Sequence, residues 1–75
     1  MKPSVYPTIT NGQFVVSGAS TQTVLRIVNA VGTTLTQFTA PGESFTHSIA
    51  GYSKGIYFIQ LLDGKQLYQF KIIKQ

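Results

Sequence analysis

The 75 residues of this chain are enough for one small domain, and a composition of 43% hydrophobic against 11% charged residues excludes an intrinsically disordered chain. The absence of cysteine excludes disulfides, catalytic thiolates and cysteine metal sites. The net charge of +4 comes from basic residues that are mostly scattered, so nucleic-acid binding is not expected. No apolar run reaches the roughly 20 residues of a membrane helix, and the first residues lack the apolar region of a signal peptide.

Strands rather than helices are expected along the whole chain, because apolar and polar residues alternate with period two and Thr, Val, Ile, Tyr and Phe dominate. Turn signals made of Gly, Pro, Asn and Asp separate the alternating runs. About seven short antiparallel strands that pack as two half-apolar sheets predict an all-β sandwich. The expected strands are residues 4–8, 12–17, 22–29, 33–39, 43–49, 55–62 and 66–74.

The stretch SVYPTITNGQF, from Ser4 to Phe14, combines the first expected strand with several turn-forming residues. Pro7 has a fixed φ and no amide hydrogen to donate, so it suits a strand start or a sheet edge. Asn11 and Gly12 are then expected to reverse the chain into the strand that contains Phe14.

The last two strands are expected to form a hairpin around Asp63-Gly64, which is a favoured two-residue turn and would pair Leu62 with Lys65. A four-residue loop would leave the face of every side chain unchanged, because it keeps the parity of the strand. The inward face is then almost wholly apolar, with Tyr57, Ile59, Leu61, Tyr68, Phe70 and Ile72. The outer face still holds the apolar residues Ile56, Phe58, Leu62, Leu67 and Ile73. Either neighbouring loops cover these residues, or they form a docking patch.

Acid–base groups are scarce in this chain, which has one histidine and two carboxylate residues. Asp63 is explained by its turn and Glu43 by the start of a strand. His47 alternates with Phe45 and Ile49, so we expect a partly buried, hydrogen-bonded side chain; no second histidine or cysteine could complete a zinc site. Neither a G-x-S-x-G stretch nor a glycine-rich phosphate loop is present. We therefore expect no enzyme, no cofactor and no metal site.

Four segments, in order and over nearly the whole chain, resemble the C-terminal sorting domains of the type IX (Por) secretion system, in their type A form. VYPTITNGQF resembles the family's YPNPxxG.F opening, and RIVNAVGTTL its I.n..G..v strand and turn. IAGYSKGIYFIQL is similar to the l..l..GiY.v.i segment, and FKIIKQ to the kKiiKq ending. One difference is that Thr8-Ile9 replaces the family's Asn-Pro. This difference argues against direct recognition of the motif by a receptor and leaves its turn-forming role intact.

The resemblance implies an immunoglobulin-like β-sandwich at the end of a larger secreted cargo protein of a Gram-negative bacterium. It implies recognition by an outer-membrane translocon, removal by a sortase-like protease, and export through the periplasm to the outer membrane, the cell surface or the medium. Matching the family's motifs residue by residue gives structural roles to six positions, which are Pro7, Asn11, Gly12, Gly32, Gly55 and Tyr57. Among these, we expect Gly32 to form a tight turn, Gly55 to start a central strand and Tyr57 to fill the core.

The end of the chain is the segment expected to be recognised by the translocon: Lys71, Ile72, Ile73, Lys74 and Gln75. Alternation places Ile72 inside and Lys71 and Ile73 outside, and Lys74 is expected to fray into solvent. An edge strand here would add to a partner's sheet through its unpaired backbone. The alternative is that the lysines only keep this edge from aggregating.

The alternative function is a small immunoglobulin-like adhesion or carbohydrate-binding module, in which Tyr6, Tyr52 and Phe38 would belong to an aromatic platform. A weak homodimer through edge strands is also expected. The domain is expected to span residues 1–75, with residues 1–3 as a remnant of a linker or an added start.

Overall fold

Eight strands build the part of the chain that the structure, a computed structural model, describes, which is residues 3–75. Met1 and Lys2, two of the three residues expected to be a remnant, lie outside the described residues, and Pro3 is buried. No helix within residues 3–75 has the length and apolar character needed to cross a membrane. The strands are β1 (Ser4–Tyr6), β2 (Ile9–Thr10), β3 (Gln13–Ser17), β4 (Val24–Asn29), β5 (Thr34–Thr39), β6 (Ser44–Ser48), β7 (Gly55–Asp63) and β8 (Gln66–Lys74).

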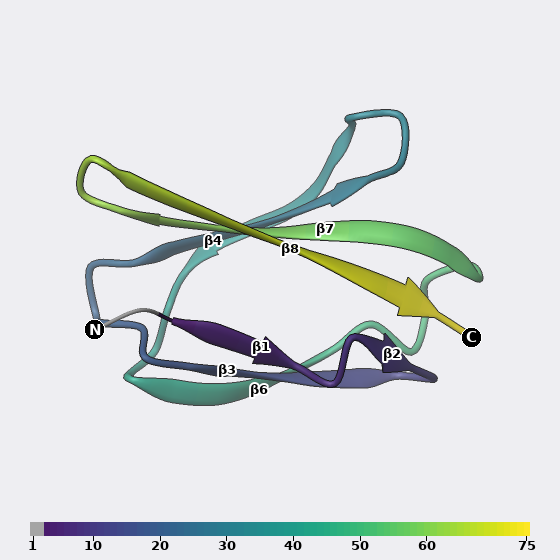
Figure 1. Ribbon diagram of the computed structural model, residues 1–75, viewed down its shortest axis with the longest axis horizontal. Coiled ribbons are helices and arrows are strands. Elements are labelled where there is room, and N and C mark those ends of the chain that lie inside the picture. The colour runs from purple at the N-terminus through teal and green to yellow at the C-terminus, as the bar shows by residue number, and fades with distance from the viewer. Residues whose placement is uncertain (1–2) are drawn as a thin grey trace.

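The strands form two sheets that pack against each other, as Figure 1 shows. One sheet has three strands in the order β1-β3-β6, and the other has five in the order β2-β8-β7-β4-β5. The expected β-sandwich is therefore confirmed, with one strand more than predicted.

The additional strand arises because residues 4–10, where a single strand over residues 4–8 was expected, are divided between the two sheets, and β2 lies beyond the expected strand. β1 pairs antiparallel with β3, whereas β2 pairs parallel with β8. Pro7 and Thr8 connect the two strands, and the Tyr6–Pro7 peptide bond is cis. Local alternation could not predict this division, because the partner of β2 is the last strand of the chain.

The core lies between the sheets and consists of side chains at alternate positions of the strands. β3 contributes Phe14 and Val16 from the three-stranded sheet, and β4 and β7 contribute most of the facing residues. The largest fully buried side chains are Phe14, Leu25, Ile27, Ile49, Ile59, Leu61, Ile72, Val16 and Thr23.

The β7–β8 hairpin has a different register from the expected one. Asp63 pairs with Gln66 and Leu62 with Leu67, so the turn is centred on Gly64 and Lys65. Gly64 has a φ of +64°, a conformation that glycine adopts easily and that suits the first central position of a hairpin turn. The predicted pairing of Leu62 with Lys65 was therefore wrong by two residues. Because a shift of two preserves parity, the inward face is the expected one.

His47 lies between the two sheets and is partly buried, as expected. Its ring centroid is 5.7 Å from that of Phe14 on β3 and 4.9 Å from that of Phe38 on β5. Burial lowers the pKa of this imidazole below the ordinary value of 6.5, because the charged form loses hydration.

Candidate recognition site

Residues from the four motif segments lie next to one another at one end of the sandwich. Ile73 of β8 pairs with Ile9 on one side and with Ile56 on the other, and Tyr57 pairs with both Ile72 and Asn29. We call this region the motif end; it comprises residues 8–12, 29–33, 53–57 and 71–75. Figure 1 shows β2 and the C-terminus at this end, away from the N-terminus.

The expected recognition segment, residues 71–75, has alternating side-chain environments. Lys71 and Ile73 are exposed and Ile72 is fully buried, as predicted. Lys74, predicted to lie in solvent, is instead only 8% exposed. It shares the inward parity of Ile72, and its Nζ donates a hydrogen bond to a main-chain carboxylate oxygen of Gln75, the last residue, at 3.1 Å. A lysine can be placed this way because its aliphatic stem packs while its ammonium reaches a polar partner.

β2 covers the backbone edge of the last residues of β8. The Ile73 amide donates to the Thr8 carbonyl at 2.8 Å, and the Gln75 amide donates to the Thr10 carbonyl at 2.8 Å. The expectation of an unpaired edge over residues 71–75 was therefore wrong. Because β2 pairs only with Ile73 and Lys74, the uncovered edge of β8 is its earlier part.

The turn after β2 is organised by the side chain of Thr10, which is buried. Its Oγ1 accepts hydrogen bonds from the amides of Gly12 at 3.1 Å and Gln13 at 3.0 Å, and donates to the Gln13 carbonyl. These bonds direct the chain from β2 back into β3. Thr10 was not among the site residues expected from the sequence, although a hydroxyl residue directly before Asn-Gly is a signal for this kind of turn.

The other opening-motif residues lie around this turn. Pro7 and Asn11 are exposed, whereas Gly12 is buried. A Cβ added at Gly12 would lie 3.5 Å from the Cβ of Ala50, so the backbone passes close to the loop after β6. The Gly12 carbonyl also accepts a hydrogen bond from the Ile49 amide at 2.8 Å.

The turn after β4 is formed by Asn29 and Gly32. The Oδ1 of Asn29 accepts hydrogen bonds from the amides of Val31 at 3.1 Å and Thr33 at 2.9 Å. Gly32 has a φ of +92°, which favours glycine, and its amide donates to the Asn29 carbonyl at 3.0 Å. The structure therefore places Gly32 in the turn expected of it, with Val31 at the tip and 85% exposed.

Gly55 begins β7, and Tyr57 closes the loop that precedes it. The hydroxyl of Tyr57 donates a hydrogen bond to the Ser53 carbonyl at 2.6 Å. The ring is buried and its centroid lies 5.3 Å from that of Tyr52. A tyrosine that bonds back to the backbone a few residues upstream resembles the tyrosine corner of immunoglobulin-like sandwiches.

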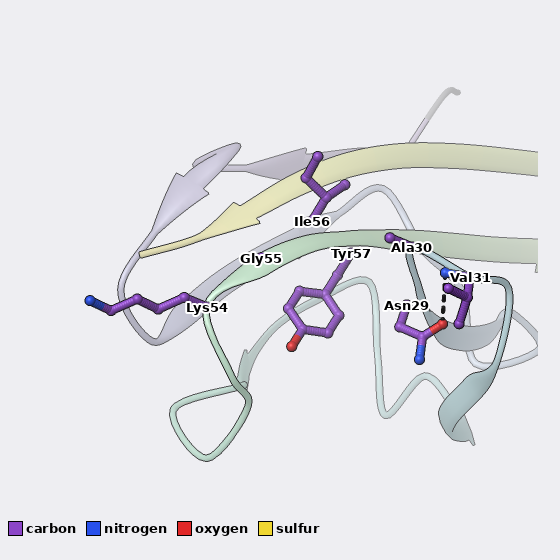
Figure 2. A pocket seen from close by; sticks show the side chains of 7 residues that line it. All are labelled: Asn29, Ala30, Val31, Lys54, Gly55, Ile56 and Tyr57. Carbon is purple, nitrogen blue, oxygen red and sulfur yellow. Dashed lines mark hydrogen bonds between the residues drawn. The ribbon is translucent and has the colours of Figure 1, made fainter.

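Two hollows at the motif end share Asn29 and Tyr57 as lining residues. The first, of about 240 Å³, also contacts Val31, Lys54 and Ile56, and Figure 2 shows that Lys54 and Ile56 extend away from the ring of Tyr57. The second, of about 520 Å³, is lined by Asn29, Leu35, Thr36, Tyr52, Ser53 and Tyr57.

The aromatic platform of the alternative function is not formed. Phe38 is half-buried against His47 and lies 6.0 Å from Phe45, and Tyr52 is half-buried with its hydroxyl 2.9 Å from that of Thr36. Tyr6 is exposed on β1, in the three-stranded sheet, whereas Phe38 lies in the five-stranded sheet. Across residues 3–75, no three metal-ligating side chains come together either.

Charge is distributed unevenly between the two ends of the molecule. Lys54, Lys71 and Lys74 lie at or next to the motif end, whereas Asp63 lies in the hairpin turn at the other end of β7 and β8. Glu43 is also at that distant end, where its carbonyl accepts a hydrogen bond from Ala19. Among the described side chains, the motif end therefore has three lysines and no Asp or Glu, and the main-chain carboxylate of Gln75 lies beside Lys74.

Comparison with known proteins gives one match. A family model described as secretion system C-terminal sorting domain matches residues 4–75, which include all eight strands and the whole motif end. None of the curated protein sequences matches the chain.

Proposed function

The chain belongs to the family of C-terminal sorting domains of the Por, or type IX, secretion system, and we propose that the secretion machinery recognises this domain, in its folded state, at the motif end. Domains of this family are not catalytic, and they direct the secretion of cargo across the outer membrane. One observation supports this location above all: the pairing of β2 with β8 and of β8 with β7 joins motif segments that are far apart in the sequence. Recognition at this end would therefore report that the domain has folded.

Within the terminal segment, some side chains are exposed for contact with the machinery, and others pack inward and fix the position of the strand. Lys71, Ile73 and Gln75 are exposed and available for contact. Ile72 and Lys74 point inward, so their part in recognition is to fix the position of the other three.

The finer assignments belong to the same proposal and are supported by the four-segment resemblance. The domain is of type A, spans residues 1–75 and lies at the end of a cargo protein that it accompanies through the periplasm. An outer-membrane translocon binds it, and a sortase-like protease removes it.

Charge reversal in a reporter fusion tests the proposed site. The chain is fused to the C-terminus of a reporter in a bacterium that has the type IX system, and exported reporter is measured for Lys71→Glu and for Lys65→Glu. Both lysines are exposed on the β7–β8 hairpin, but Lys65 lies at its far end. We expect export to fall several-fold only for Lys71→Glu, because rim charges direct association with a complementary partner. Equal export by the two variants would contradict recognition at this segment.

A weak homodimer through edge strands is the second part of the proposal. It is supported by β5, which ends the five-stranded sheet, and by the part of β8 that β2 leaves uncovered. Such edges have unpaired backbone groups that can join a second sheet. Analytical ultracentrifugation should show a monomer–dimer equilibrium at millimolar concentration, and a pure monomer would rule the dimer out.

A further inference from the structure

Three isoleucines from three neighbouring strands form a continuous apolar row on the outer face of the five-stranded sheet. Ile73 of β8 is the cross-strand neighbour of Ile9 on β2 and of Ile56 on β7. Their exposed fractions are 53% for Ile9, 38% for Ile56 and 37% for Ile73. We call this set the isoleucine row. Ile9 was not among the outer-face residues expected from the sequence, because its pairing with β8 was not foreseen.

The row continues into the smaller hollow at the motif end. Ile56 lines this hollow together with Val31 and Lys54. Figure 2 shows Ile56 and Tyr57 extending from opposite sides of β7, which leaves Ile56 on the outer side while Tyr57 fills the core. The apolar surface therefore reaches from β2 across β8 and β7 to the tip of the β4–β5 turn.

Positive charge borders this apolar surface. Lys71 lies on the same face of β8 as Ile73, two residues earlier, and Lys54 lines the hollow beside Ile56. The two carboxylate residues of the chain, Asp63 and Glu43, are at the other end of the sandwich. An apolar centre with a charged border is the usual arrangement of a protein-binding surface.

The charge pattern discriminates between the candidate occupants. A second copy docked on the same surface about a two-fold axis would bring Lys54 and Lys71 of both copies into one interface, with no Asp or Glu at this end and only the main-chain carboxylate of Gln75 to offset them. A lipid surface is disfavoured because the row lacks the exposed tyrosine or tryptophan residues that typically anchor a protein at a membrane interface. A protein with apolar side chains surrounded by carboxylates fits both features.

We propose that the isoleucine row is the docking surface for a protein of the secretion machinery whose own contact surface is apolar with an acidic border. This inference rests on the proposed function and specifies which surface of the motif end is contacted, namely the outer face of β2, β8 and β7. Ile9 and Ile56 contribute to recognition although neither belongs to residues 71–75.

The test uses the reporter fusion with the complete chain and a matched pair of variants. Ile56→Asp places a charge in the isoleucine row, and Leu67→Asp places one on the same outer face at the far end of the hairpin, where Leu67 is 56% exposed. We expect Ile56→Asp to lower export by about tenfold or more, as truncation of a central interface residue does, and Leu67→Asp to leave export nearly unchanged. The double variant Ile9→Thr, Ile56→Thr keeps β-branched strand residues and should lower export without lowering the melting temperature of the purified domain.

Several results would overturn the inference. Equal export by Ile56→Asp and Leu67→Asp would show that the secretion machinery does not bind the row. Binding of the wild-type domain to phosphatidylglycerol vesicles that Ile56→Asp abolishes would assign the row to lipid. Loss of a dimer in Ile56→Asp would assign it to a second copy.

The same assay separates this inference from the proposed terminal site. If Lys71→Glu is exported normally while Ile56→Asp is not, the part of Lys71 in recognition fails and the isoleucine row stands, with Lys54 as its remaining bordering charge. The opposite result overturns the row alone.

Discussion

At the scale of single residues, the motif end depends on Thr10, which joins β2 to β3 through one side-chain oxygen. We predict that Thr10→Val destabilises the domain by about 1–3 kcal/mol, because it keeps the shape of the side chain but leaves buried amide groups without an acceptor. Urea unfolding measures the change, with Thr39→Val, at an exposed position of β5, as the control. If both variants lose the same small amount of stability, the Thr10 hydrogen bonds do not hold the turn.

The sequence predicted the burial of some single side chains correctly and that of others wrongly. Ile72 and Tyr57 were placed correctly in the core, because alternation along a strand decides which face a side chain occupies. The expectation that Lys74 frays into solvent was wrong, because β2 pairs with the end of β8 and orders it. The bonding of Thr10 requires three backbone groups to come together, which its residue type alone does not determine.

At the scale of elements, β2 is a two-residue strand that decides which part of the β8 edge is covered. We predict that the Ile73 amide exchanges slowly with solvent deuterium, because it donates to the Thr8 carbonyl. The amides of Gln69 and Lys71 have the same parity on β8 but lie beyond the reach of β2, so they should exchange quickly. Amide exchange followed by NMR at a concentration where the domain is monomeric provides the comparison, and equal protection of all three amides would show that the whole edge is covered.

The strands themselves were predicted better than their pairing. The ranges of β4 to β8 differ from the expected ones by at most two residues at either end, because turn residues and alternation are local signals. The register of the β7–β8 hairpin was wrong because Asp63-Gly64 and Gly64-Lys65 are both plausible turn centres, and the choice is made by pairing along the two strands. The formation of β2 after the expected first strand depends on a partner at the end of the chain, so no local pattern contained it.

At the scale of the whole molecule, the sandwich places the proposed recognition features at one end, where folding assembles them from four segments. The chain can act as a sorting signal without catalytic groups, because a cargo label needs only a surface that its receptor can bind. An uneven charge distribution supports this reading, since a cationic end can orient the domain as it approaches an acidic partner. The remaining structure holds this end in place, and its integrity depends on the packing between the two sheets.

That packing leads to a prediction for pH, because His47 lies between Phe14 of one sheet and Phe38 of the other. Burial lowers the pKa of His47 in the folded domain below 6.5, so as pH falls the unfolded chain takes up this proton before the folded one does. Stability from this residue is therefore complete above about pH 7.5 and decreases as pH falls through 6.5 toward the lowered folded pKa. Thermal unfolding between pH 7.5 and 5.5 should show a falling melting temperature for the wild type and a flatter profile for His47→Gln. Parallel profiles would mean that protonation of the imidazole is not coupled to the association of the sheets.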